Sequence, residues 1–288
     1  MQLYFCGVRG STPAPGEAYV RYGGHTSCVA VAHDGDAPSL VLDGGTGLAN
    51  LDRVFEDAPF DGTILLGHLH WDHTHGLPFF AAGTRPGHRV RVLIPGQGAD
   101  AERVLARAFS PPHFPIEPSA LGEGWSFDAI EEGEHALEGF SVVARQIPHK
   151  GGRTFGFRVS DGTSSIAYLS DHHPLALGPG PDGLGELHSA AVELAAGVDM
   201  LIHDAQYTAD ELPRLAYLGH SCAEYAIGLA DAAGARQVCL FHHAPQRTDS
   251  EIDELVGRVI GGPVPVVTAA EGLTVYLDGQ NGHRRRPI

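Results

Sequence analysis

Four side chains of metal-binding type within six residues constrain this chain more than any other feature of its sequence. The motif is His68-x-His70-x-Asp72-His73, and it follows the apolar run Thr63–Leu66, which is typical of a short strand. In an extended turn, alternate residues point to the same side, so His68 and His70 can share one ion. Asp72 and His73 follow where the chain curls toward a helix, and they can face another. The spacing predicts two metal ions about 3.5–4 Å apart, with a histidine-rich surface turn as the alternative.

The composition predicts a globular, acidic protein. Of the 288 residues, 43% are apolar and 19% are charged, a balance that argues against a mainly disordered chain. The net charge of −16 disfavours binding to bulk nucleic acid or to an anionic membrane unless a basic patch is set apart locally. We therefore expect a small substrate as the partner, rather than nucleic acid or a membrane.

The sequence also predicts the compartment. No stretch approaches the roughly 18 uninterrupted apolar residues of a transmembrane helix, and the start of the chain lacks the basic and apolar segments of a signal peptide. The four cysteines (Cys6, Cys28, Cys222 and Cys239) are widely spaced, with no C-x-x-C pair. This cysteine usage fits a reduced, cytoplasmic protein better than a disulfide-bonded one.

Short strands alternate with helices in both halves of the chain. Apolar runs bounded by Gly, Pro and Asp are typical of strands, whereas apolar residues at helical spacing indicate helices. Strands are expected at 3–8, 27–32, 39–42, 63–66, 89–94, 140–145, 155–159, 165–169, 200–203, 238–241 and 273–277. Helices are expected at 100–108, 185–196, 221–233 and 250–260, with an ordered loop over 110–127. This order predicts one α/β domain over residues 1–288, built from two similar halves, about 1–138 and 139–288.

Further motifs accompany the histidine motif along most of the chain. They are Gly7–Ser11, Tyr22–Cys28, Val41–Gly47, Pro148-His149, Ser170–His172, Leu201–Tyr207, Gly219–Ser221 and Leu240–Pro245. In this order they resemble the metallo-β-lactamase superfamily, and more closely its phosphodiesterase branch, which includes the tRNA 3′-processing ribonucleases (RNase Z) and cyclic-nucleotide phosphodiesterases. The resemblance implies an αββα sandwich, in which two sheets pack face to face with helices outside. It places a metal site on loops at one edge of that sandwich.

The resemblance assigns seven ligands to two divalent ions. One ion is held by His68, His70 and His149, the other by Asp72, His73 and His242, and Asp171 bridges the two. Imidazole and carboxylate ligands suit Zn²⁺ and also accept Mn²⁺ or Fe²⁺. On sequence alone, His243 competes with His242 for the last position, and His149 and Asp171 could instead be ordinary loop residues.

The resemblance also implies a catalytic pair. His220 would protonate the leaving oxygen of a phosphodiester, and Asp204, where the ribonucleases commonly carry Glu, would orient its imidazole. Asp72 is expected to act in catalysis as well as in metal binding. Two divalent ions can lower the pKa of a shared water and hold the hydroxide as nucleophile. The alternative is that His220 merely precedes a helix that Ser221 caps.

Several other polar residues surround this predicted centre. Asp43 is expected to accept a hydrogen bond from a ligand imidazole or to brace the motif turn. His203 and His172 are interpreted as structural. His25 stands where the branch often has Asn, so no role is assigned to it.

The interval between His149 and Asp171 bears on the substrate. The ribonucleases usually carry a long basic arm there, but the two residues are only 22 positions apart, and two predicted strands fill the interval. Together with the net charge, this favours a small phosphodiester such as a cyclic nucleotide over a tRNA. Lys150 and Arg153 could supply local positive charge to such a substrate.

The Pro-rich segment 110–127 offers a second possible contribution to the substrate site. His113, Phe114 and Phe127 could wall a pocket and stack a base, or they could simply pack in the core.

Three alternatives to a small-molecule phosphodiesterase stay open. The chain could be an RNase Z-like tRNA 3′-processing endoribonuclease, working as a homodimer that borrows a basic surface. It could hydrolyse a carboxylic ester, lactone or thioester, which the pairing of His220 with Asp204 weakly disfavours. It could also be a non-catalytic metal-binding module, which the intact set of ligand positions disfavours.

Overall fold

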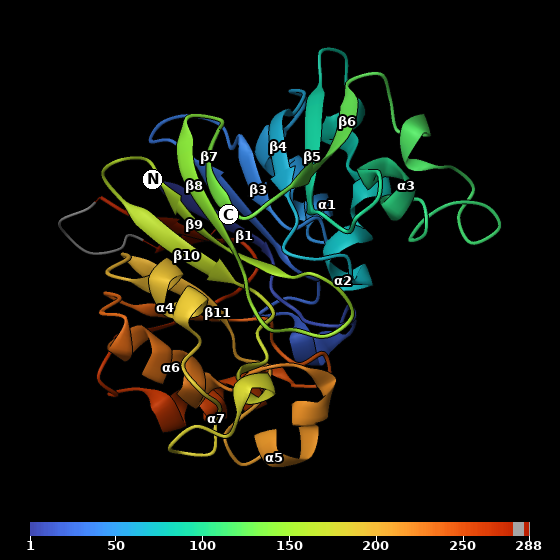
Figure 1. Cartoon of the computed structure of the whole chain (residues 1–288). Helices are drawn as coiled ribbons and strands as arrows, with labels where there is room; N and C mark the ends of the chain where they lie inside the picture. The colour runs from blue at the N-terminus through green and yellow to red at the C-terminus, as the bar shows by residue number, and fades with distance from the viewer. Residues whose placement is uncertain (279–284, 288) are drawn as a thin grey trace.

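Two β-sheets form the centre of the protein (Figure 1). The computed structural model describes residues 1–278 and 285–287. In spatial order, the first sheet contains β15 (Arg285–Pro287), β14 (Leu273–Tyr276), β1 (Gln2–Gly7), β2 (Cys28–Ala32), β3 (Leu40–Leu42), β4 (Asp61–Leu65), β5 (Arg89–Pro95) and β6 (Trp125–Ile130). The second sheet contains β13 (Val266–Thr268), β12 (Val238–Phe241), β11 (Met200–Asp204), β10 (Ser165–Leu169), β9 (Phe155–Ser160), β8 (Phe140–Gln146) and β7 (Gly133–Leu137).

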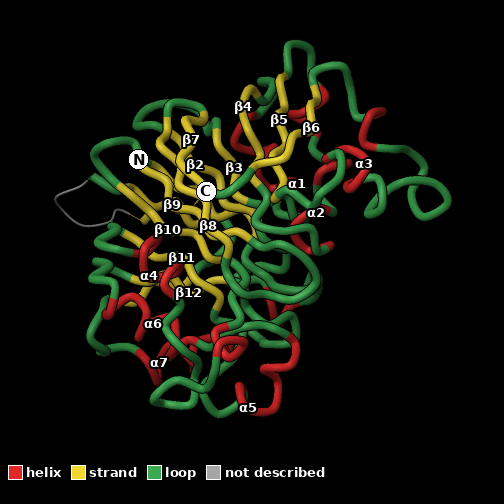
Figure 2. The backbone as a smooth tube through the Cα atoms, viewed as in Figure 1, coloured by secondary structure: helices red, strands yellow, loops and turns green. Residues whose placement is uncertain are grey.

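Helices lie outside the sheets, and Figure 2 shows them around the central strands. Helices α1 (Leu48–Phe55), α2 (Trp71–Thr74) and α3 (Ala101–Leu105) accompany the first sheet, and α4 (Ser189–Ala195), α5 (Leu212–Leu215), α6 (Ala223–Ala232) and α7 (Asp249–Val259) the second. Short 3₁₀ helices are η1 (Glu17–Tyr19), η2 (Leu77–Phe79), η3 (Ala81–Thr84), η4 (Pro118–Ala120), η5 (Pro174–Leu177) and η6 (Ala216–Leu218). Within the described part of the chain, none of these helices has the length and apolar character that crossing a membrane requires.

Three apolar interfaces hold these layers together. Phe5, Phe157 and Phe241 belong to the cluster between the two sheets, to which both sheets contribute side chains. A second cluster joins α1 to the outer face of the first sheet, and a third joins α4, α6 and α7 to the outer face of the second. The layer order is therefore helix, sheet, sheet, helix, and the predicted αββα sandwich is confirmed.

Each sheet has a parallel part, and the functional motifs follow it. Strands β3 to β6 run parallel in the first sheet, and β10 to β13 run parallel in the second. Because parallel neighbours end at the same edge of a sheet, the loops that follow them lie side by side. Asp43 follows β3, His68 follows β4, Asp171 follows β10, and His242 follows β12. The fold thus gathers residues from both sheets without any long connecting arm between β8 and β10.

Some predicted elements differ from the structure. The expected loop over 110–127 ends early, because Trp125 begins strand β6 and pairs with Val90 of β5. The helix expected from residue 185 begins only at Ser189. Helix α1 is not among the predicted helices: Leu48, Leu51 and Phe55 have helical spacing, but Gly47 precedes the helix and no side chain caps it. Division of the chain into two similar halves stays a prediction, and the C-terminal strands β14 and β15 join the sheet that the N-terminal strands build.

Truncation of a side chain between the sheets should destabilise the fold. Phe157 is 0% exposed in the inter-sheet cluster, so Phe157→Ala should lower the free energy of unfolding by about 3–5 kcal/mol. Chemical denaturation followed by circular dichroism measures this loss. The matched control is Phe79→Ala, because Phe79 is 65% exposed and its truncation should cost about 0.5 kcal/mol or less. Equal losses for the two variants would contradict the assignment of the core.

Candidate metal centre

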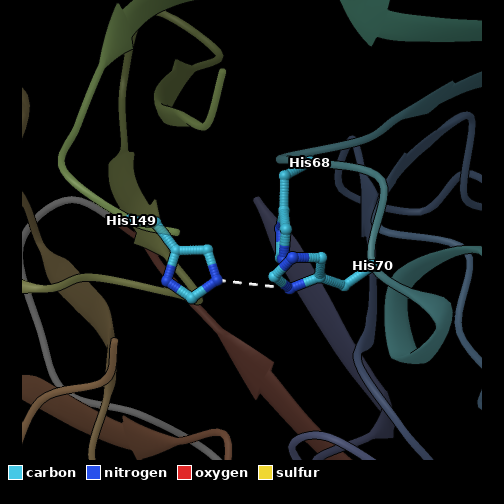
Figure 3. A group of neighbouring side chains, drawn as sticks. All are labelled: His68, His70 and His149. Atoms are coloured by element: carbon cyan, nitrogen blue, oxygen red, sulfur yellow. Dashed lines mark hydrogen bonds between the residues drawn. The ribbon is translucent and has the colours of Figure 1, made fainter. Parts of the chain in front are cut away.

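Three histidines from two segments form the first group of possible ligands. His68 and His70 lie on the loop after β4, and His149 lies on the loop after β8. Figure 3 shows the His149 ring facing the other two across a narrow gap. His149 Nε2 lies 3.3 Å from His70 Nδ1, and the donor atoms of all three lie within 4.8 Å of one another. This spacing suits three ligands of one ion.

A second group lies beside the first. It consists of Asp72, His73, Asp171 and His242, all of them buried, with donor atoms again within 4.8 Å of one another. His242 Nε2 lies 3.1 Å from Asp72 Oδ2, and His73 Nε2 lies 3.2 Å from the same oxygen. The seven residues that the sequence nominated as ligands are therefore brought together in two adjacent groups.

The Asp171 carboxylate stands between the two groups. Its Oδ1 lies 3.8 Å from His68 Nε2 and 3.6 Å from His149 Nε2. Its Oδ2 lies 3.0 Å from His73 Nε2 and 3.3 Å from His242 Nε2. Each oxygen thus faces a different group, which is the arrangement that a bridging carboxylate requires.

The burial of these donors supports a fit to metal ions. Asp171 is 1% exposed, yet neither of its oxygens has a hydrogen-bond partner among the described residues. Both ring nitrogens of His68 and Nε2 of His73 also lack one there. Leaving an ionised carboxylate buried and unpaired is costly, and so is leaving several polar atoms without partners. Divalent cations between the two groups would satisfy these atoms, and imidazole nitrogens with carboxylate oxygens are the donors that zinc accepts.

The pKa shifts of these donors favour the protonation states that bind a cation. Burial lowers the pKa of His68 well below its ordinary value and lowers that of His149 to about 4, so both imidazoles keep a free lone pair. Burial alone would raise the pKa of Asp171, but the surrounding histidines, His242 and His73 foremost, hold it well below its ordinary value. The carboxylate is therefore ionised.

Asp43 is not one of the candidate ligands, but it accepts hydrogen bonds that hold the second group in place. Its Oδ2 accepts hydrogen bonds from His73 Nδ1 at 2.7 Å, from the Tyr168 hydroxyl at 2.7 Å and from Ser170 Oγ at 3.1 Å. Its Oδ1 accepts the backbone N–H of Gly67 at 2.7 Å. The structure thus shows both expected contacts, to a ligand imidazole and to the motif turn. With Nδ1 as donor to Asp43, Nε2 of His73 is left to face the site.

The ring of His73 lies in a strongly negative surrounding. Burial would lower its pKa, but the carboxylates of Asp72 and Asp43 outweigh burial and raise it well above the ordinary value. This part of the site therefore favours a positive charge, which a metal ion would provide.

His220 and Asp204 form a pair at the edge of the metal groups. His220 Nδ1 lies 3.0 Å from Asp204 Oδ2 and 3.5 Å from Asp171 Oδ1. Burial would lower the pKa of His220, but the Asp204 carboxylate raises it to about 9. Ser221 does not cap the following helix α6; the cap position is Cys222, and the Ser221 N–H donates to Asp204. The capping interpretation of this segment is therefore wrong.

Three nearby histidines lie outside the two groups of candidate ligands. His243 points into the core and contacts the Ala269 carbonyl at 2.9 Å, so His242 is the member of the pair that reaches the site. His203 is fully buried and contacts the Asp204 carbonyl at 2.8 Å and His172 Nδ1 at 2.9 Å. These contacts agree with structural roles for His203 and His172.

The two basic residues after His149 are engaged with the protein itself. Lys150 Nζ donates to the Tyr217 carbonyl. Arg153 Nη1 donates to the Gly96 carbonyl at 2.9 Å and to Glu131 at 2.7 Å. Their hydrogen-bonding capacity is therefore partly used in holding the loops around the site.

The aromatic residues of the Pro-rich segment do not surround the metal groups. His113 and Phe114 line a mainly apolar cavity of about 430 Å³ together with His25, and none of the seven candidate ligands lines it. Phe127 lies on β6, with its ring centroid 6.1 Å from that of Trp125. His113 and Phe114 thus line a cavity away from the candidate ligands, so a role of this segment in the substrate site stays a prediction, while Phe114 and Phe127 pack against the apolar cluster of the first sheet.

Sequence reasoning missed three contributors to the site. The backbone N–H of Ser11 donates to Asp72 Oδ2 at 2.6 Å, and Ser11 adopts a φ of 63°. Tyr168 reaches Asp43 from the second sheet. Trp71, inside the histidine motif, is 66% exposed. Trp71 lies between two predicted ligands and Ser11 ends the motif Gly7–Ser11, so the sequence marked both positions; the contacts of Ser11 and Tyr168 themselves arise from tertiary packing.

Comparisons with known proteins agree with this geometry. The domain family described as the Beta-lactamase superfamily domain matches residues 40–243. Ribonuclease Z from Halobacterium salinarum is 34% identical over an alignment of 331 positions that covers 95% of this chain and 96% of that protein.

Solved structures share the fold. YhfI from Bacillus subtilis, a metallo-β-lactamase fold protein, superposes with a TM-score of 0.68 at 18% identity, covering 95% of this chain and 97% of that one. A diphosphatase from the PhnP family has a TM-score of 0.66 at 18% identity, with 96% and 97% coverage. At these identities the likeness concerns the fold alone.

Removal of the Asp43 charge should weaken metal binding. Asp43→Asn leaves the size of the side chain nearly unchanged but removes the charged acceptor that fixes the tautomer and orientation of the His73 ring, so affinity for the ion at His73 should fall about 10- to 100-fold. Competition with a chromogenic chelator measures the change. Tyr168→Phe is the matched control, because it removes a donor to the same carboxylate and should leave metal affinity close to wild type. Unchanged affinity in Asp43→Asn would show that the contact with His73 does not support a metal ligand.

Proposed function

Because the chain belongs to the metallo-β-lactamase superfamily of hydrolases, we propose that it is a dinuclear metal-dependent phosphodiesterase acting on small phosphodiesters such as cyclic nucleotides. The observation that carries the proposal is the Asp171 carboxylate, whose two oxygens face two separate groups of ligands. The first ion would be held by His68, His70 and His149, the second by Asp72, His73 and His242. When bound, two divalent ions such as Zn²⁺, with Mn²⁺ or Fe²⁺ as alternatives, would supply Lewis acidity and a water of lowered pKa.

The protein's own contribution to bond cleavage is the pair of His220 and Asp204. With Nδ1 donating to Asp204, the His220 ring is fixed in one orientation, and its other nitrogen, Nε2, is the one available to a substrate. His220 also lines a cavity of about 470 Å³ together with His70, Asp72 and Asp171. A proton on Nε2 would thus be in place for transfer to the leaving oxygen of a bound diester.

Several features favour a small substrate. The cavity at the ligands is of the size that small ligands occupy. Strands β9 and β10 fill the interval between His149 and Asp171, so this segment supplies no basic arm. The net charge of −16 opposes a polyanion of tRNA size.

The second candidate is an RNase Z-like tRNA 3′-processing endoribonuclease. The observation that favours it is the 34% identity to a ribonuclease Z across almost the whole chain. This relative weighs against excluding nucleic acid on charge alone. A homodimer that presents a basic surface would reconcile the two observations.

Metal content and hydrolysis measured together test the proposal. The wild type should bind about two metal ions and hydrolyse bis(p-nitrophenyl) phosphate and a cyclic nucleotide. Asp171→Ala should lose metal and rate together, since it removes both bridging oxygens. His220→Ala should keep its metal and lose about 10²- to 10⁴-fold in rate on the cyclic nucleotide, whose leaving group needs a proton.

The control for a lost histidine is His113→Ala, which lies in another cavity and should retain full rate. Full activity of His220→Ala on the cyclic nucleotide would reject the proton-donor role. Cleavage of a precursor tRNA at a rate above that of every small diester would favour the ribonuclease instead. A protein that holds two metals but hydrolyses none of these substrates would defeat both candidates.

A further inference from the structure

An exposed tryptophan stands beside the candidate ligands. Trp71 is 66% exposed, although its neighbour Asp72 is buried and its other neighbour is His70. Its ring is stacked on that of His75, with centroids 5.4 Å apart and an angle of 19° between the planes. A large aromatic face held in place and left open to solvent is the kind of surface that proteins use for binding.

Two neighbouring cavities have Trp71 in their walls. One is the cavity of about 470 Å³ that contains His70, Asp72, Asp171 and His220. The other has about 360 Å³ and is lined by His68 as well as by α3 and the loop 151–153. Trp71 and Leu69 line both cavities. A molecule with its phosphate at the metal ligands can therefore extend past Trp71 into the second cavity.

The walls of the second cavity combine apolar and polar groups. Val104, Leu105 and Ala108 supply aliphatic surface opposite the loop. Arg107 lines the same cavity, and its guanidinium makes no ion pair or hydrogen bond with any described residue. Gln97 donates to the Arg153 carbonyl at 3.3 Å and so holds the loop that forms the remaining wall. Polar and apolar groups thus contribute about equally to the lining, so a flat heterocycle would find apolar contact for its faces and hydrogen-bonding groups for its edge.

The loop wall is coupled to a candidate ligand. Gly151 has a φ of 86°, and a Cβ at this position would lie 2.6 Å from His70 Nε2. The backbone of the second cavity thus packs directly against the His70 ring, so the two cavities share one wall at the metal centre.

On the basis of the proposed function, we propose that the 360 Å³ cavity binds the nucleoside part of a nucleotidyl phosphodiester, with its base against Trp71 and its phosphate at the ligands in the neighbouring cavity. A nucleobase presents a π-face that stacks on an aromatic ring whatever its identity. Arg107 supplies the donor for a base edge or for a second phosphate in an otherwise acidic chain. The substrate class is therefore a diester that carries at least one nucleoside, rather than an alkyl phosphodiester.

Tryptophan fluorescence tests this subsite without any hydrolysis. The chain has two tryptophans, and the Trp125→Phe variant leaves Trp71 as the sole reporter. Adenosine 5′-monophosphate should quench Trp71 emission in a saturable manner, whereas ribose 5-phosphate, which lacks the base, should not. Absence of quenching by the nucleotide, or equal quenching by both compounds, would overturn the proposal.

Kinetics with a matched pair of substrates provide the second test. Thymidine 5′-(p-nitrophenyl phosphate) and methyl p-nitrophenyl phosphate share a leaving group and differ in the nucleoside. Trp71→Ala should raise KM for the nucleotidyl diester about fivefold or more relative to any change in KM for the methyl diester. Phe79→Ala is the matched control, because Phe79 is equally exposed but lines a different cavity.

Arginine variants localise the polar contact. Arg107→Gln should raise KM for the nucleotidyl diester, and Arg103→Gln, a change on the same segment but outside the cavity lining, should not. Equal KM values for the nucleotidyl diester in wild type, Trp71→Ala and Arg107→Gln would reject the subsite while the phosphodiesterase function stands. If neither diester is hydrolysed, the proposed function fails, and the fluorescence measurement alone decides the subsite.

Discussion

The buried Asp171 carboxylate is the constraint on which the rest of the site depends. It is almost completely buried and ionised, and neither oxygen has a hydrogen-bond partner within the described residues. A charge in that position is stable only if opposite charge lies close to it. Imidazoles stand on both sides of the carboxylate, and the Nε2 atoms of His68, His73, His149 and His242 lie 3.0–3.8 Å from its oxygens. Cations between these groups would supply the opposite charge that the buried carboxylate requires.

Two other buried carboxylates, those of Asp43 and Asp204, differ from Asp171 because donors within the protein bind both of their oxygens. Asp43 accepts four hydrogen bonds: from a ligand imidazole, from the motif turn, from Tyr168 of β10 and from Ser170 just after that strand. Asp204 faces His220 and accepts the backbone N–H groups of His172, Gln206 and Ser221. These satisfied groups connect the loops of the two sheets, so the positions of the ligands depend on the packing of the sandwich. Such outer contacts fix the orientation of a metal ligand and keep the ligand ready for its ion.

The rim of the site is less polar than its interior. Trp71 and Leu218, both exposed, line the cavity that contains His220 and Asp72. One scaffold of this superfamily serves several kinds of hydrolysis, so the fold alone does not define the substrate. Trp71 begins α2, Leu218 ends η6, and the neighbouring cavity is lined by α3 and Arg107. Substrate selection is therefore expected to depend on these segments, and the chemistry on the residues at the edge of the sheets.

The residues by themselves predicted one α/β domain and a metal motif at His68–His73, because strand patterns and closely spaced ligands are local signals. The sandwich architecture and the remaining ligands, His149, Asp171 and His242, followed from the resemblance of the ordered motifs to the superfamily. Tertiary structure alone decided between His242 and His243, since the two are adjacent and only the direction of each side chain separates the site from the core. It also supplied the contacts of Asp43 with Tyr168 and of Asp72 with the Ser11 backbone, which join residues 125 and 61 positions apart. The first contact depends on how the two sheets pack and the second on how the loops after β1 and β4 meet at one edge of the first sheet, and no local pattern of residues encodes either.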